Sequence, residues 1–123
     1  MKKLIGIALI SLLVSCGVNQ NTNVIDRYIV ETEVHLQEGK TDEVLALFKA
    51  TNPELVRDES DWIRASFSAV EGEDIVIVRA EWKRKESYLK FSGSKRFKET
   101  MGQFGKYFAG KPKVTITKIL FEM

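Results

Sequence analysis

The stretch that decides the fold is WIRASFSAVEGEDIVIVRAEW, residues 62–82. Its first part alternates apolar and polar side chains, which is the period of a β-strand with one buried face. Its second part, residues 75–83, again places alternate side chains on one side: Val76, Val78, Ala80 and Trp82. The EGED segment between them is typical of a turn. The sequence therefore predicts an antiparallel hairpin with one apolar face.

Two helices are predicted before this hairpin. Apolar side chains recur at helical spacing over residues 24–38, and Gly39 would end that helix. Thr41 or Asp42 then caps a second helix, which ends near Pro53.

Three further elements are predicted after the hairpin. SYLKF, residues 87–91, looks like a third strand. Ser92 or Ser94 caps a helix with one apolar stripe, formed by Phe97, Met101, Phe104 and Phe108. Residues 113–123 are predicted to form a last strand. Its apolar end predicts that other elements cover both faces of this strand. The order ααβββαβ predicts an α+β fold, with N-terminal helices and an antiparallel sheet of about four strands that has helices packed on one face.

An export signal is predicted at residues 1–15, where two lysines precede a short apolar run that is too short to span a membrane. LVSC, residues 13–16, resembles the lipobox of bacterial lipoproteins, in which the cysteine is lipidated. The resemblance implies a mature chain that begins at Cys16 and stays on a membrane. Gly17 follows where the family's inner-membrane signal has aspartate, which implies the outer membrane, facing the periplasm, in a bacterium with two membranes. The alternative is an ordinary signal peptide that contains a cysteine.

The predicted organisation is a signal peptide at 1–15, a lipidated cysteine with a flexible tether at 16–23, and a single α+β domain at 24–123. Small and polar residues fill the tether. Cys16 is the only cysteine, so once it is lipidated no thiol remains for a disulfide.

Charge is divided unevenly along the chain. Residues 16–78 hold 5 basic and 13 acidic side chains, net −8, whereas residues 79–123 hold 12 basic and 4 acidic, net +8. Such asymmetry indicates contact with a polyanion, a membrane or an acidic partner. The alternative is that the two halves neutralise each other within the fold. The candidate residues for an anionic surface are Lys83, Arg84, Lys85, Lys95 and Arg96.

Familiar catalytic motifs are missing from the sequence. His35 is the only histidine, so a zinc site built on a histidine pair is excluded. There is no G-x-S-x-G elbow and no Walker or dinucleotide loop. Asp58, Glu59 and Asp61 cluster without the spacing of an EF-hand. We therefore expect no catalytic residue, no metal and no cofactor.

Two families resemble parts of the domain. QEGKTDEVLALF, residues 37–48, followed by DWIRASF, resembles the small outer-membrane assembly lipoproteins. EGKTDEVLALF together with SGSKRFKETMGQFGKYFAGKPKVTI, residues 92–116, is similar to the nuclear-transport-factor-2-like cone fold, which hosts binding proteins and small enzymes.

The main functional hypothesis is a membrane-anchored envelope lipoprotein with a small non-enzymatic binding domain, in an assembly, protective or inhibitory role. Its expected partners are the lipid bilayer, through Cys16, and an envelope protein or anionic lipid, but not nucleic acid. One alternative is a small cone-fold enzyme or ligand-binding protein that uses His35, Asp58 or Asp61. Another is a phage- or plasmid-derived exclusion or immunity lipoprotein.

Overall fold

A computed structural model describes residues 26–123. The chain divides into two units, which are treated separately. Arg27–Lys118 form a compact unit, while Asp26 and Ile119–Met123 are the described part of the other. The predicted signal peptide, the predicted lipidation site at Cys16 and the predicted tether lie outside the described residues.

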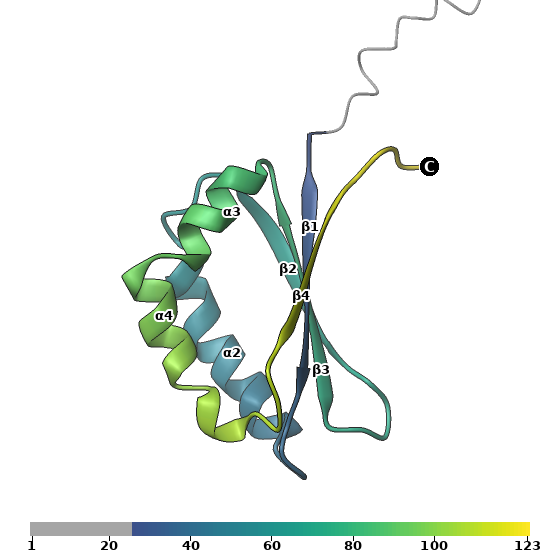
Figure 1. Ribbon diagram of the computed structural model, residues 1–123, viewed down its shortest axis with the longest axis vertical. Coiled ribbons are helices and arrows are strands. Elements are labelled where there is room, and N and C mark those ends of the chain that lie inside the picture. The colour runs from purple at the N-terminus through teal and green to yellow at the C-terminus, as the bar shows by residue number, and fades with distance from the viewer. Residues whose placement is uncertain (1–25) are drawn as a thin grey trace, which may run out of the picture. The chain divides into compact units, whose positions relative to one another are not determined.

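The compact unit is a sheet covered on one face by helices. In chain order its elements are β1 (Tyr28–His35), α2 (Thr41–Val56), β2 (Trp62–Ala69), β3 (Ile75–Trp82), α3 (Lys85–Ser92), α4 (Lys95–Gly102), the 3-10 helix η2 (Gly105–Tyr107) and β4 (Lys113–Lys118). The strands form one antiparallel sheet in the order β2-β3-β1-β4, and the helices lie on one side of it (Figure 1). The predicted α+β class, with a four-stranded antiparallel sheet and helices on one face, is confirmed. Within residues 26–123 no helix combines the length and apolar character that crossing a membrane requires.

The predicted order of elements was wrong at the N-terminal end. Residues 28–35, predicted as part of a helix, form β1, an interior strand that pairs with β3 on one side and β4 on the other. The helical interpretation used the spacing of Tyr28, Ile29 and Thr32. Valine, isoleucine and threonine make up half of this segment, and such β-branched side chains favour a strand.

The SYLKF segment was also assigned wrongly, because it belongs to helix α3 rather than to a third strand. Asp61 accepts a hydrogen bond from the Ser87 hydroxyl in the first turn of this helix, where a negative charge is favourable. Tyr88 and Phe91, three residues apart, both place their rings against Trp82. Helical spacing therefore brings both aromatic rings onto the sheet, which strand alternation would not do.

The predicted hairpin is confirmed as β2 and β3. Gly72 in its turn has a φ of +81°, a left-handed value that glycine adopts without strain. The register pairs Phe67 with Val78. A register shift between Trp62 and Arg64 marks a bulge at the start of β2, and a bulge re-aims the side chains beside it.

Two clusters of apolar side chains fill the space between the sheet and the helices, and Met101 of α4 packs against both. In one cluster the rings of Phe48 and Phe104 stack with their centroids 4.5 Å apart. The other is built around Trp82, whose ring lies 5.0 Å from that of Phe91. Phe104 is 0% exposed, as the predicted apolar stripe requires, although the predicted helix divides there into α4 and η2.

Helix α4 begins where the sequence predicts, but the predicted cap of α2 was wrong. Lys40 occupies the N-cap position of α2 and no side chain caps the helix. Thr41 is the first helical residue, and its hydroxyl donates a hydrogen bond of 2.8 Å to Asp74. Asp74 also accepts the Gly39 backbone N–H, and these hydrogen bonds, that from Gly39 first, lower the pKa of its carboxyl. Ser94 caps α4 by accepting the backbone N–H of Phe97 at 3.1 Å.

The last strand is shorter and less covered than predicted. β4 ends at Lys118 and lies at one edge of the sheet, so the prediction of cover on both faces was wrong. Val114 in this strand exposes 49% of its surface. The apolar residues Leu120 and Phe121 belong to the other unit, and they expose 77% and 69%.

Candidate functional site

A cavity of about 340 Å³ lies between the sheet and the helices. Its volume falls within the range of small-molecule sites, about 300–1,000 Å³. Twenty residues from the strands, the helices and the segment before β4 line it, and none of them is Asp, Glu, His, Lys or Arg. The cavity therefore suits an apolar molecule whose recognition depends on a few neutral polar groups.

The most unusual of these polar groups is the indole N–H of Trp82. Trp82 lines the cavity and is 1% exposed. Its Nε1 is buried and has no hydrogen-bond partner among the described residues. A buried donor without an acceptor costs about 1–3 kcal/mol, and buried polar groups in proteins are nearly always paired. An acceptor on a bound molecule would remove this penalty.

The surrounding structure holds Trp82 in place. It is the last residue of β3, where the sheet pairs it with Tyr28 on one side and Trp62 on the other. The rings of Tyr88 and Phe91 pack against the indole, with centroids 5.8 and 5.0 Å away. The N–H is therefore fixed in direction before any molecule binds.

Tyr88 supplies a second donor in the cavity wall. Burial raises the pKa of its phenol, while a hydrogen bond with Ser92 acts in the opposite direction. The phenol therefore stays protonated at neutral pH and can donate its O–H. Thr32 and Asn52 also line the cavity, and within residues 26–123 neither side chain has a hydrogen-bond partner.

The cavity is open to solvent at the β4 edge. Val114 lines it and is half exposed, and Phe108 and Pro112 line it from the segment that enters β4. In Figure 1 β4 passes in front of β1, so the reader looks at the molecule from this edge.

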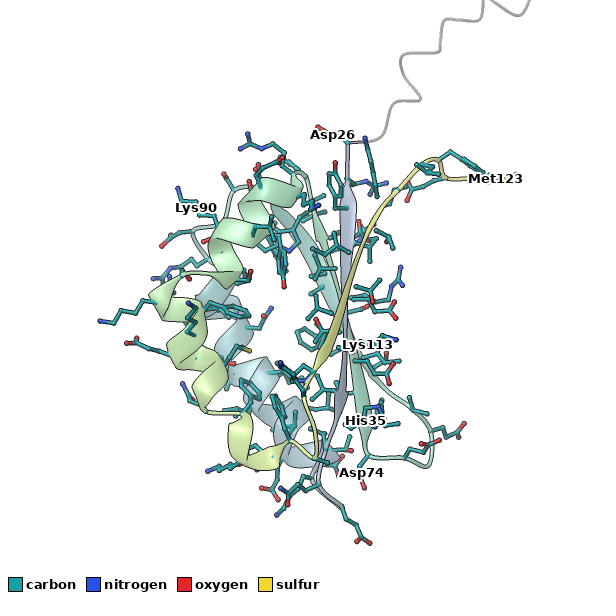
Figure 2. The ribbon with its side chains drawn as sticks, viewed as in Figure 1. Asp26, His35, Asp74, Lys90, Lys113 and Met123 are labelled. Carbon is teal, nitrogen blue, oxygen red and sulfur yellow. The ribbon has the colours of Figure 1, made fainter. Side chains whose placement is uncertain are left out.

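His35 does not contribute to the cavity. It lies in β1 on the side of the sheet away from the helices (Figure 2). Its side chain is 53% exposed, and its Nε2 is 2.7 Å from Glu33 Oε2. The residue that the enzyme alternative names first is therefore a surface residue.

Asp58 and Asp61 lie together in a separate polar hollow between the loop after α2 and helix α3. Asp58 is 73% exposed. Asp61 is 15% exposed and accepts hydrogen bonds from Ser87 and, at 2.7 Å, from Arg84. These two contacts, Ser87 first, lower the pKa of Asp61. The carboxylate of Asp61 therefore stabilises the start of α3. Because His35 does not line this hollow, His35, Asp58 and Asp61 do not form one site.

The five basic residues predicted to bind an anionic surface are all exposed, but three of them contact acidic residues of the same chain. Arg84 pairs with Asp61 at 2.7 Å, Arg96 lies 3.9 Å from Asp58, and Lys95 lies 3.8 Å from Glu99. Arg84 and Arg96 thus join the basic half to the acidic half, as the alternative of mutual neutralisation requires. An anionic-surface role for the five residues stays a prediction.

Sequence reasoning placed Trp82 on the inner face of the hairpin but assigned it no role. Strict alternation from the hairpin turn would place Ile63, not Trp62, opposite Trp82. The register shift between Trp62 and Arg64 brings Trp62 opposite Trp82 instead. The sequence therefore did not show that two indoles share one face, and it did not show the cavity, which depends on how far the helices stand from the sheet. Within residues 26–123 no group of three or more His, Cys, Asp and Glu side chains is placed to hold a metal ion.

Several solved structures share this fold. A protein from Nitrosomonas europaea that is classed with antibiotic biosynthesis monooxygenases superposes with a TM-score of 0.68 at 11% identity, over 79% of this chain and 93% of its own. The cofactor-independent oxygenase SnoaB from Streptomyces nogalater superposes with a TM-score of 0.66 at 12% identity, over 76% and 93%. A conserved protein from Methanosarcina mazei gives 0.67 at 20% identity, over 76% and 93%. At these identities the likeness shows the fold.

A family model described as antibiotic biosynthesis monooxygenase matches residues 27–103. The match covers more than half of the chain and contains Trp82, Tyr88 and most of the other cavity-lining residues. A comparison with curated proteins found no match.

This match overturns the assignment to the bacterial lipoproteins, to the small outer-membrane assembly lipoproteins and to the nuclear-transport-factor-2-like fold. The main functional hypothesis was therefore wrong: it described a non-enzymatic envelope lipoprotein with the bilayer as partner and the outer membrane as location. The expectation that the protein is not an enzyme was also wrong. The findings favour the alternative of a small enzyme or ligand-binding protein, although on another fold and without its named residues. The chain belongs to the antibiotic biosynthesis monooxygenase family.

Proposed function

We propose that the domain is a small oxygenase that binds an apolar, electron-rich molecule in the cavity beside Trp82 and promotes its reaction with O₂. The observation that carries this proposal is the unpaired indole N–H of Trp82 in the wall of an otherwise apolar cavity. Membership of the family and the fold shared with a cofactor-independent oxygenase support the choice of reaction.

In such a reaction the substrate itself supplies the electrons that O₂ requires. An activated CH₂ group loses two hydrogen atoms and gains one oxygen atom, while the second oxygen atom leaves as water: R₂CH₂ + O₂ → R₂C=O + H₂O. Electron transfer to O₂ is easier from the enolate of a ketone than from the ketone. A protein that stabilises the enolate oxygen therefore accelerates the slow step.

Trp82 and Tyr88 are suited to this stabilisation. Both lie in the cavity wall, and both present a neutral donor. A fixed donor aimed at a developing oxyanion is worth more in a dry cavity than in water, because nothing needs to reorganise during the reaction. No lining residue is a strong base, so the substrate's own CH₂ group has to be acidic enough to lose its proton to water.

The test uses anthrone, a flat tricyclic ketone whose CH₂ group has this acidity. We expect the full-length protein to bind anthrone without O₂ present, and to consume one O₂ per anthrone with formation of anthraquinone in air. An oxygen electrode and the product's absorbance give the rate, against a blank without protein. Labelled ¹⁸O₂ should place one heavy atom in the quinone.

A cavity-filling variant makes this test specific. Ala80→Met adds a side chain to the cavity wall, and it should abolish both binding and rate enhancement. Ala46→Met, at an exposed position of α2, is the matched control and should keep both. Binding that Ala80→Met abolishes, without any oxygen uptake above the blank, would reject the oxygenase and leave a ligand-binding protein. Failure of both binding and uptake would reject the site.

A further inference from the structure

Asn52 places a carboxamide in a row of apolar side chains on the inner face of α2. Val44, Phe48 and Val56 occupy this row at intervals of four residues, and they expose 0%, 8% and 8% of their surfaces. Asn52 completes the row, is half buried and lines the cavity. Asparagine is among the poorer formers of a helix interior, and within residues 26–123 its side chain has no hydrogen-bond partner. The fold therefore gains nothing from the carboxamide at this position.

The neighbours of Asn52 in this row fix its place above the sheet. Phe48, one turn earlier, has its ring 4.9 Å from that of Phe67 in β2. Val56, one turn later, belongs to the cluster built around Trp82 of β3. The register sets Phe67 and Trp82 two side-chain rows apart along the inner face of the sheet. Asn52 therefore lies above the row between them.

That middle row begins with two alanines. Ala65 of β2 pairs with Ala80 of β3, and both line the cavity. Val30 of β1 is the next residue of the row and also lines the cavity. Because an alanine side chain is a single methyl group, this row leaves space between the sheet and α2. A ring that fills the space lies between the two alanines and the carboxamide of Asn52.

Asn52 offers a ligand something that the other polar groups of the cavity do not. The indole of Trp82 can only donate a hydrogen bond. Among the twenty lining side chains, only that of Asn52 contains a carbonyl oxygen, which is an acceptor, and its NH₂ group is a donor as well. A ketone that accepts the Trp82 N–H but carries no other polar group would cover this carboxamide and leave it without a partner. An unpaired polar group in a closed site weakens binding, whereas a matching hydroxyl on the ligand restores the lost hydrogen bond.

We propose that Asn52 is a specificity-determining residue, which accepts a hydrogen bond from a hydroxyl on the ring body of the substrate. The natural substrate is then a hydroxylated ketone, held by its ketone oxygen at Trp82 and by its hydroxyl at Asn52. Two fixed polar contacts allow one orientation of a flat molecule, whereas one contact allows several. The proposal rests on the proposed function, because it uses the same cavity.

Fluorenone and its hydroxylated forms test this preference, because they carry a ketone but no CH₂ group that could react with O₂. In 2-, 3- and 4-hydroxyfluorenone the hydroxyl lies too far from the ketone to bond with it. Trp62 and Trp82 are the only tryptophans of the chain, and both line the cavity, so quenching of protein fluorescence measures binding. We expect the best-fitting isomer to bind the full-length protein about fivefold more tightly than fluorenone, the gain of one neutral hydrogen bond.

Variants of Asn52 show whether this residue causes the preference. Asn52→Leu keeps a branched side chain but removes the carboxamide, and Asn52→Ala removes it without adding bulk to the cavity. Both should lose the fivefold preference while they still bind fluorenone. Both should also raise the Tm, because leucine and alanine are better helix formers than asparagine. Gln103→Leu removes an exposed carboxamide outside the cavity, and this matched control should keep the preference.

Four outcomes would overturn the proposal, and they separate it from the proposed function. A wild type that binds fluorenone but prefers none of the isomers would reject the role of Asn52 and keep the cavity as a site. A preference that both Asn52 variants retain would do the same. A lower Tm in both variants, with fluorenone and its isomers weakened equally, would show that Asn52 serves the fold. Failure of the wild type to bind any of these ketones would reject the site, and the proposed function with it.

Discussion

Replacing Trp82 with phenylalanine separates the structural role of this residue from its role in binding. Phenylalanine keeps an aromatic ring against Tyr88 and Phe91 but removes the indole N–H, which has no partner in the unbound protein. The variant therefore asks whether the N–H belongs to the fold or to a ligand.

Two opposing terms set the stability of this variant. The smaller ring leaves a void that costs about 1 kcal/mol, while loss of the unpaired donor removes a penalty of about 1–3 kcal/mol. We expect the free energy of unfolding to change by less than about 2 kcal/mol, with either sign. Ligand binding loses a hydrogen bond to an oxygen that carries partial or full negative charge, about 1.5 kcal/mol, which is about a tenfold weaker Kd.

Urea unfolding and anaerobic calorimetric titration with anthrone measure the two quantities. Trp62→Phe is the matched control, because it removes the other indole from the cavity wall at a position that is only half buried. We expect this control to weaken binding by less than about threefold. A Trp82→Phe protein that loses more than about 3 kcal/mol of stability while its Kd for anthrone is unchanged would refute the argument.

The remaining predictions concern the core and two perturbed groups. Phe104→Ala should lower the free energy of unfolding by about 3–5 kcal/mol, because the ring is fully buried against Phe48. If urea unfolding shows that this free energy falls by less than about 1 kcal/mol, the prediction is contradicted. Asp74→Asn should lower the Tm at neutral pH. The folded-state pKa of Asp74 is depressed, so its contribution is present above the ordinary aspartate pKa and disappears as pH falls through the folded value. Equal Tm differences at pH 7 and at about pH 2 would contradict the role of the ionised carboxylate. Tyr88 should titrate above the ordinary tyrosine pKa. Its stabilisation is complete below that ordinary pKa and is lost as pH rises through the folded value. The difference in ultraviolet absorbance between the wild type and Tyr88→Phe measures this titration, and a midpoint at or below about 10 would show that burial does not control it.

The error over residues 28–35 has a physical cause that sequence reasoning could have weighed. Tyr28, Ile29 and Thr32 fit helical spacing, but Val30 and Val34 fit the alternation of the inner face of a strand, and both are buried there. Ile29 on the other face is also buried, although Glu31, Glu33 and His35 on that face are polar. This one apolar residue out of phase is enough to give helical spacing together with Tyr28 and Thr32. The partners of this strand, β3 and β4, begin about 45 and 85 residues further along the chain, which a local pattern does not show.

Local chemistry was sufficient where the contacts are local. The turn at Gly72, the alternation on β2 and β3, and the cap at Ser94 depend on residues a few positions apart, and the sequence by itself determined them, together with the α+β class. Only the tertiary structure decided the site. Trp82, Tyr88 and Phe97 line one cavity with Val114 of β4 because segments far apart in the chain pack around it, and the indole N–H of Trp82 finds no acceptor there among the described residues. A missing contact between distant segments leaves no periodic pattern in a sequence, so only packing in three dimensions shows it.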